Sequence, residues 1–153
     1  MRRMRDCENS GVPKRARRIF PGAGQAPVGR TLTPMVLVDT SVWIRFLANR
    51  LPYAAQLDSL LEHDEAAGHD LVYGELLIGD AGGRSRLLNA YELMHRVPSV
   101  SHAEVVTFAQ AHKLHGLGIG WIDVHLLASA LVAGTPLWTA DEHLAKLAGK
   151  LGV

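Results

Sequence analysis

The sequence predicts an α/β domain with a mainly parallel sheet over residues 35–153, and three observations support it. Val36–Val38 is an unbroken apolar run, which is typical of a strand buried on both faces. Short apolar runs of this kind alternate with segments of helical periodicity, as in α/β folds. The chain has 153 residues, 48% hydrophobic and 20% charged, enough for one domain with a real core.

The first helix follows the first strand directly. Thr40 or Ser41 is expected to cap it, with Trp43, Ile44 and Leu47 on its inward face. Later elements are assigned from apolar periodicity, capping residues and glycine or proline stops. Further helices are expected over residues 53–63, 70–78, 84–94, 101–115, 121–133 and from 141 onward, and short strands at 66–67, 136–139 and 151–153.

Two of these helices have specific signatures. Ser101 and Glu104 have the spacing of a capping box, in which each side chain bonds the backbone N–H of the other. The segment W-I-D-V-H-L-L-A-S-A-L-V-A, residues 121–133, is apolar almost all round and is therefore expected to be buried. A glycine hinge precedes it, at residues 116, 118 and 120.

The first 34 residues differ from the rest in charge. They hold eight Lys/Arg and two acidic residues, net +6, whereas residues 35–153 hold eight and thirteen, net −5. With little to bury, residues 1–34 are expected to be disordered. They are either a basic arm that binds RNA phosphates or a dispensable extension from an over-long start, and we favour the second.

Composition also indicates the cellular compartment expected for the protein. Cys7 is the one cysteine, so no intrachain disulfide is possible, which fits a reducing, cytoplasmic location. No apolar run approaches the roughly 20 residues of a membrane-spanning helix, so no membrane association is expected.

Four acids stand in apolar surroundings: Asp39, Glu75, Asp123 and Asp141. Asp39 and Asp141 follow predicted strands, and the carboxyl ends of parallel strands meet at one edge of a sheet. A buried, unpaired carboxylate is costly, and no lysine or arginine in these segments is placed to pair with all four. A hard divalent cation, Mg²⁺ or Mn²⁺, would satisfy them and could activate water on a phosphodiester.

Each acid also has a structural alternative. Asp39 and Asp141 could simply cap the first and last helices, and Glu75 could point to solvent. Asp123 could be stabilised by the dipole at its helix start.

Ser41 is expected to be a cap rather than a nucleophile, and Arg45 could contact phosphate or merely lie on the exposed face of the first helix. His69 and His143 could touch RNA but are expected on the surface, and His125 is expected to be packed or at an interface. The three tryptophans are expected in the core or at a dimer interface: Trp43, Trp121 and Trp138.

Four stretches resemble the PIN-domain ribonucleases, in particular the VapC toxins of bacterial toxin–antitoxin pairs. They are V-L-V-D-T-S-V-W-I, Y-G-E-L-L-I-G, G-L-G-I-G-W-I-D-V-H-L-L-A-S-A-L and L-W-T-A-D-E-H-L. The resemblance covers residues 35–153 as a PIN domain and none of residues 1–34. It implies a three-layer α/β/α sandwich around a parallel sheet of four or five strands.

The resemblance also implies an activity. The family's acidic cluster falls on Asp39, Glu75, Asp123 and Asp141, binds Mg²⁺ or Mn²⁺, and has its hydroxyl position at Thr139, with Thr40 nearby. Family members cut RNA to leave a 5′-phosphate and a 3′-hydroxyl, typically dimerise, and are inhibited by a VapB antitoxin. The alternatives are a non-catalytic PIN-like protein-binding module and an aspartyl-phosphate phosphatase, although Ser41 stands where the latter normally has a second Asp.

Overall fold

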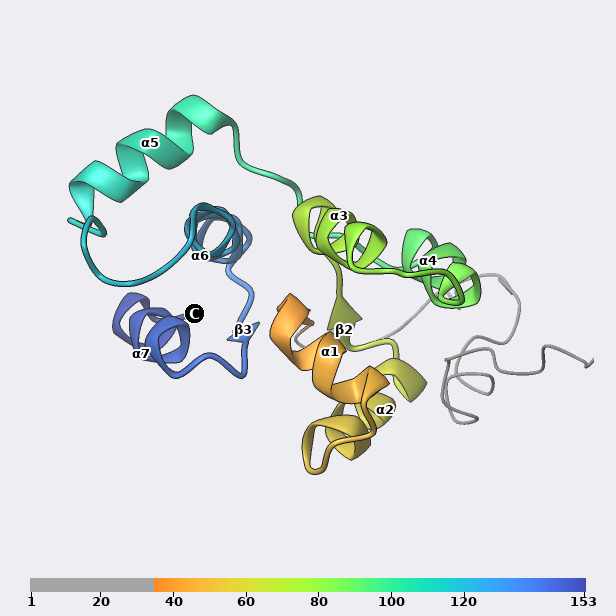
Figure 1. Cartoon of the computed structure of the whole chain (residues 1–153). Helices are drawn as coiled ribbons and strands as arrows, with labels where there is room; N and C mark the ends of the chain where they lie inside the picture. The colour runs from red at the N-terminus through yellow and green to blue at the C-terminus, as the bar shows by residue number, and fades with distance from the viewer. Residues whose placement is uncertain (1–34) are drawn as a thin grey trace, which may run out of the picture.

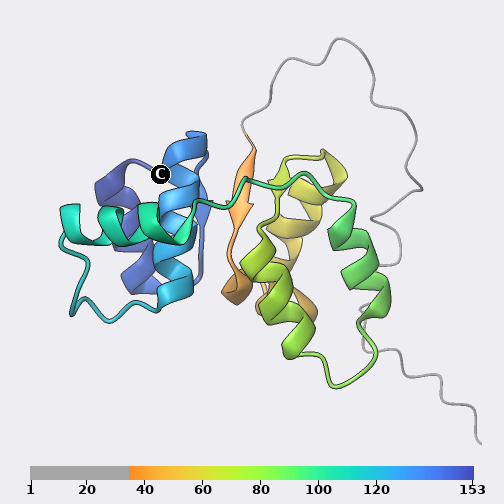
Figure 2. The same ribbon diagram turned by 90° about the horizontal axis from the view of Figure 1, so that it is seen from above.

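The computed structural model describes residues 35–153, so the basic extension predicted for residues 1–34 lies outside the described part. The sheet lies between two groups of helices: α5, α6 and α7 on one side and α2, α3 and α4 on the other (Figure 1), and Figure 2 shows the same division from above. The elements in chain order are β1 (Val36–Val38), α1 (Thr40–Leu47), α2 (Tyr53–Glu62), β2 (Ala66–Ala67), α3 (Asp70–Ile78), α4 (Ser85–Glu92), α5 (His102–Ala111), α6 (Trp121–Ala133), β3 (Leu137–Trp138) and α7 (Glu142–Leu151).

The sheet is parallel, as predicted, with the strand order β2-β1-β3. Leu37 of β1 stands opposite Ala67 on one side and Leu137 on the other. The described residues form three strands rather than the expected four or five, plus one isolated parallel bridge between Gly68 and Arg96. The predicted strand over residues 151–153 is wrong, because α7 continues to Leu151.

The start of α1 was predicted correctly, and Trp43 and Leu47 face the core as expected, whereas the predicted cap and the inward placement of Ile44 are wrong. Asp39, rather than Thr40 or Ser41, is the N-cap. The buried face consists of Val42, Trp43 and Phe46, whereas Ile44 is 53% exposed. At about 100° per residue, Ile44 is turned about 200° from Val42 and therefore lies on the opposite side of the helix.

The helices after α3 lie at the expected positions, but α4 and α5 are shorter than expected. The capping box between Ser101 and Glu104 is present at the start of α5. α5 ends at Ala111 instead of residue 115, and Lys113 already has a left-handed backbone. α6 has the predicted bounds, but burial is limited to its middle turns, since Val132 is 78% exposed. Within residues 35–153, every helix is too short or too polar to cross a bilayer.

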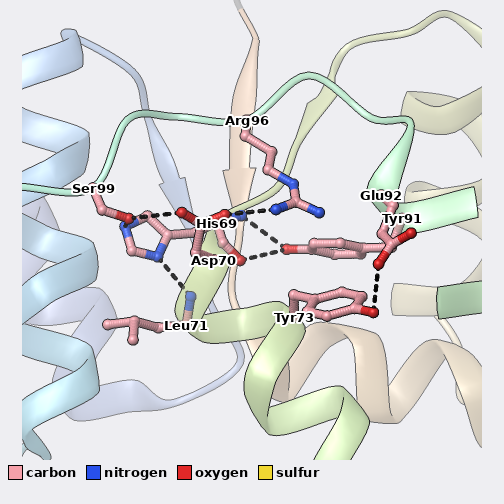
Figure 3. A network of polar contacts seen from close by, with 8 residues as sticks. All are labelled: His69, Asp70, Leu71, Tyr73, Tyr91, Glu92, Arg96 and Ser99. Carbon is pink, nitrogen blue, oxygen red and sulfur yellow. Dashed lines mark hydrogen bonds and ion pairs between the residues drawn. The ribbon is translucent and has the colours of Figure 1, made fainter. Parts of the chain in front are cut away.

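His69 was expected on the surface and is fully buried instead. It is the N-cap of α3: its Nδ1 accepts the Leu71 N–H at 3.2 Å, and its Nε2 lies 3.0 Å from the Ser129 hydroxyl on α6. Its backbone N–H donates to the Tyr91 hydroxyl at 2.8 Å (Figure 3). This network ties the β2–α3 junction to α4 and α6, and so fixes the helix that carries Glu75.

Candidate active site

Asp39 lies where β1 turns into α1. Its backbone N–H donates to the Trp138 carbonyl of β3 at 3.0 Å, so the ends of the two neighbouring strands lie side by side. Its Oδ2 accepts hydrogen bonds from the Ser41 hydroxyl, from the Ser41 N–H at 3.3 Å and from the Thr139 hydroxyl at 2.8 Å. The side chain is only 5% exposed. A buried carboxylate with several donors on one oxygen is held in a fixed orientation.

Two hydroxyl groups connect Asp39 to the segment that follows β3. The Ser41 Oγ accepts the Ala140 N–H at 2.9 Å, and the Thr139 Oγ1 accepts the Asp141 N–H at 3.0 Å. Asp141 then caps α7, with its Oδ1 accepting two backbone N–H groups of the first turn. The expected meeting of the two strand ends is therefore present, and short hydroxyl side chains hold it together.

Glu75 approaches the same edge from the middle of α3. Its Oε2 accepts a hydrogen bond from the Thr40 hydroxyl, on the first residue of α1. The Glu75 side chain is half-buried rather than turned fully to solvent. Thr40, expected only to lie near the site, thus joins the carboxylate of α3 to the residue that follows Asp39.

Asp123 is in the first turn of α6. Its Oδ2 accepts the Gly120 N–H at 2.7 Å. Burial raises the pKa of the Asp123 carboxyl, the Gly120 hydrogen bond opposes this shift, and the negative charges of Asp39, Asp141 and Glu75 raise the pKa further. Three carboxylates from other parts of the chain therefore act electrostatically on Asp123.

The donor set suits a hard cation. Each of the four carboxylates uses one oxygen in the contacts described above, and the other oxygen has no hydrogen bond within residues 35–153. All-oxygen ligation is characteristic of Mg²⁺ and Mn²⁺. Within the same residues, no group of three or more His, Cys, Asp or Glu side chains is already arranged to hold a metal ion. The oxygens without a hydrogen bond are the atoms available to a cation, and within residues 35–153 they are not arranged as a finished metal site.

The structure gives Ser41 a larger role than the sequence did. Ser41 was interpreted as a helix cap, yet its hydroxyl bridges Asp39 and the residue after Thr139. Of the two places expected for Trp121, the core and a dimer interface, the structure excludes the core: the side chain is 44% exposed and contacts His102 and His125 at centroid distances of 5.3 and 5.0 Å. Trp43 is fully buried, as predicted.

Comparison with known proteins identifies the class. The PIN domain family matches residues 36–150. The chain is 41% identical over 120 residues to Ribonuclease VapC32 of Mycobacterium tuberculosis, in strain CDC 1551 / Oshkosh and equally in strain H37Rv, covering 78% of this chain and 94% of the relative. The chain therefore belongs to the PIN-domain family and, within it, to the VapC ribonucleases.

One solved structure is also similar in shape. The crystal structure of PAE2754 from Pyrobaculum aerophilum matches with a TM-score of 0.48 and 20% sequence identity, covering 78% of this chain and 90% of the other.

Proposed function

We propose that this protein is a metal-dependent endoribonuclease that acts as the toxin of a type II toxin–antitoxin pair. The observation that carries the proposal is the arrangement of four carboxylates, three of which raise the pKa of the fourth. The ribonuclease name of a relative that is 41% identical supports RNA as the substrate. An aspartyl-phosphate mechanism is less well supported, because Ser41 stands where such phosphatases normally have a second Asp and the relative is named a ribonuclease.

The proposed cofactor is Mg²⁺, with Mn²⁺ as a substitute, held by Asp39, Glu75, Asp123 and Asp141. When bound, such an ion supplies a Lewis acid for the phosphate oxygens and lowers the pKa of a coordinated water. The protein's own part is orientation. Ser41 and Thr139 fix the Asp39 carboxylate, and the Thr40 hydroxyl fixes that of Glu75.

The proposed reaction is hydrolysis of a phosphodiester bond by in-line attack of water, leaving a 5′-phosphate and a 3′-hydroxyl. Asp123 takes part in this reaction as one of the four carboxylates that would hold the ion, and the Gly120 N–H holds its Oδ2 in place.

The proposed partners are a VapB-like antitoxin and a second copy of the chain. Apolar side chains on three helices are available for such contacts, since Ile44, Ile78 and Val132 are 53%, 88% and 78% exposed. A basic antitoxin side chain entering the acidic site would neutralise the same carboxylates that the cation neutralises.

Cleavage of RNA by the full chain tests the proposal. Total RNA is incubated with Mg²⁺, with EDTA, and with the Asp39→Asn variant, and product 5′ ends are mapped. Loss of an outer-shell partner commonly costs 10–100-fold, so loss of a ligand charge is expected to lower the cleavage rate by about 100-fold or more. Asparagine retains an oxygen for the Ser41 and Thr139 bonds, so the fold should persist. Glu62→Gln, an exposed acid at the end of α2, is the matched control.

Each result separates the hypotheses. Cleavage at the wild-type rate by Asp39→Asn would contradict the four-carboxylate site. Phosphate trapped covalently on Asp39 would favour the phosphatase alternative. Metal-dependent thermal stabilisation without cleavage of any RNA would favour the non-catalytic binding module.

A further inference from the structure

Arg45 is a cation beside the candidate active site. Helical side chains lean toward the N-terminus of their helix, and the Arg45 Nη1 donates to the Ser41 carbonyl at 3.2 Å. Ser41 is the residue whose hydroxyl donates to Asp39. The guanidinium therefore reaches back from the last turn of α1 to its first turn, next to the residue that orients a site carboxylate.

Two aromatic rings extend this contact toward β3. The Arg45 guanidinium carbon lies 5.0 Å from the centre of the Tyr53 ring. Tyr53 stacks on Trp138 with ring centres 6.1 Å apart and planes 18° apart. Trp138 immediately precedes Thr139, which donates to Asp39. Guanidinium groups bind aromatic faces favourably, so this stack restrains Arg45 at the edge of the site.

Arg45 has donors to spare. An arginine side chain carries five N–H donors, and within residues 35–153 the one hydrogen bond of this guanidinium is to Ser41. In the same part of the chain it forms no ion pair, although Asp39 caps the start of its helix and Glu75 accepts a hydrogen bond from Thr40 there. A last-turn arginine often stabilises the C-terminal helix dipole, but this guanidinium is turned away from that end.

We propose that Arg45 binds a phosphate group of the RNA strand beside the scissile bond, an inference that rests on the proposed ribonuclease function. Residues 35–153 carry a net charge of −5, and the site itself is acidic, so it repels an RNA backbone. A planar guanidinium at its edge offers two parallel donors that fit a phosphate. Arg45 thus supplies the attraction that the carboxylates lack.

The test is the salt dependence of RNA binding. The full-chain Asp39→Asn protein, expected not to cleave, is titrated against a fluorescently labelled single-stranded RNA of mixed sequence at several KCl concentrations, and binding is followed by anisotropy. Adding Arg45→Gln is expected to weaken binding and to make the slope of log Kd against log salt shallower by about 0.7, the value for one phosphate contact on a single strand. Glutamine keeps a planar amide that can lie on Tyr53, and thermal unfolding checks that the variant folds.

Two further variants act as controls. Arg86→Ala removes an exposed arginine of α4 and is expected to leave the slope unchanged. Arg45→Lys retains the charge but not the planar fork, so it should retain the slope and lose part of the affinity. The basic residues of 1–34 are the same in every variant and cancel in the comparison.

The outcomes distinguish this inference from the function on which it rests. RNA binding by the parent protein with the same slope and affinity in Arg45→Gln overturns the Arg45 contact alone. Weaker binding with an unchanged slope also overturns it, because that result indicates a structural role. Failure of the parent to bind RNA at any salt concentration overturns the proposed function and the inference together.

Discussion

Asp39 has a structural role and a proposed chemical role, and each role uses a different oxygen of its carboxylate. The Oδ2 atom caps α1 and accepts the hydroxyls of Ser41 and Thr139. The Oδ1 atom has no hydrogen bond within residues 35–153 and so remains available. The sequence left helix capping and metal binding as alternative roles for Asp39. In the structure the two roles are compatible, because capping occupies only one oxygen of the side chain.

The buried His69 should make stability depend on pH. Burial lowers the pKa of His69, and the negative charge of Asp70 only partly offsets this. The unfolded state then takes up a proton near the usual histidine pKa of about 6.5, before the folded state does, so stability falls as the pH drops below that value. Protonation of Nδ1 also breaks the cap to the Leu71 N–H.

Unfolding free energies measured in urea between pH 7.5 and pH 5 check this expectation. His69→Asn keeps a good N-cap but cannot titrate, so its stability should lack that part of the decline, whose slope is at most about 1.4 kcal/mol per pH unit. His115→Asn, in an exposed loop, is the control. Equal pH profiles for wild type and His69→Asn would refute the assignment.

Single residues were predictable where an acid stood alone among apolar neighbours. Asp123 could be selected because residues 114–140 contain no other aspartate or glutamate and no lysine or arginine. The role of Ser41 could not be predicted, because a serine at a helix start is common in any helix, and for Arg45 a phosphate contact and a place on the exposed helix face both stayed open. Their contacts with Asp39 and Tyr53 depend on the side-chain directions that the fold sets.

At the scale of elements, the β2–α3 junction needs glycine at position 68. A Cβ there would lie 2.8 Å from the Tyr91 Cζ and hydroxyl, and that hydroxyl is held by the His69 N–H. Gly68→Ala should therefore destabilise the protein by about 1–3 kcal/mol, as in other overpacked cores. Gly74→Ala, inside α3 with nothing within 4 Å of the added carbon, should instead stabilise by about 0.5–1 kcal/mol.

Urea-induced unfolding of the two variants provides the comparison. Because both changes add one methyl group within seven residues of each other, general effects on expression or solubility are matched. Equal stabilities for Gly68→Ala and Gly74→Ala would mean that Tyr91 does not pack against the junction in this way.

Local signals predicted where helices and strands occur, but tertiary packing decided how far they extend and which faces are buried. The bounds of α3 and α6 followed from a capping position and a terminal glycine, which are properties of the local chain. The exposure of Ile44 was not predictable in this way. The eight-residue helix α1 has apolar residues on several sides, so its sequence does not decide which side is buried. The predicted last strand is absent because α7 continues to Leu151 and the Val153 N–H donates to the Ala148 carbonyl.

At the scale of the molecule, the fold brings together acids that are up to 102 positions apart in the sequence. Asp39 and Asp141 converge because β1 and β3 are parallel neighbours, and Glu75 joins them through Thr40 of α1. Asp123 arrives on α6, which packs on β3 and α7. The convergence of the two strand ends could be predicted from the parallel sheet. The approach of α3 and α6 could not, because it depends on helix packing, which short sequence patterns do not show.

In the proposed site these four carboxylates share one divalent cation, and Mn²⁺ binding by the full chain is the measurement that tests this sharing. Isothermal titration is carried out on wild type, on Asp141→Asn, which retains its cap, and on Glu62→Gln as the control. We predict that wild type and Glu62→Gln bind Mn²⁺ equally, with about 2.7 kcal/mol of stabilisation at 100 times Kd, and that Asp141→Asn binds at least about 10-fold more weakly. Equal affinity in all three proteins would contradict a shared site.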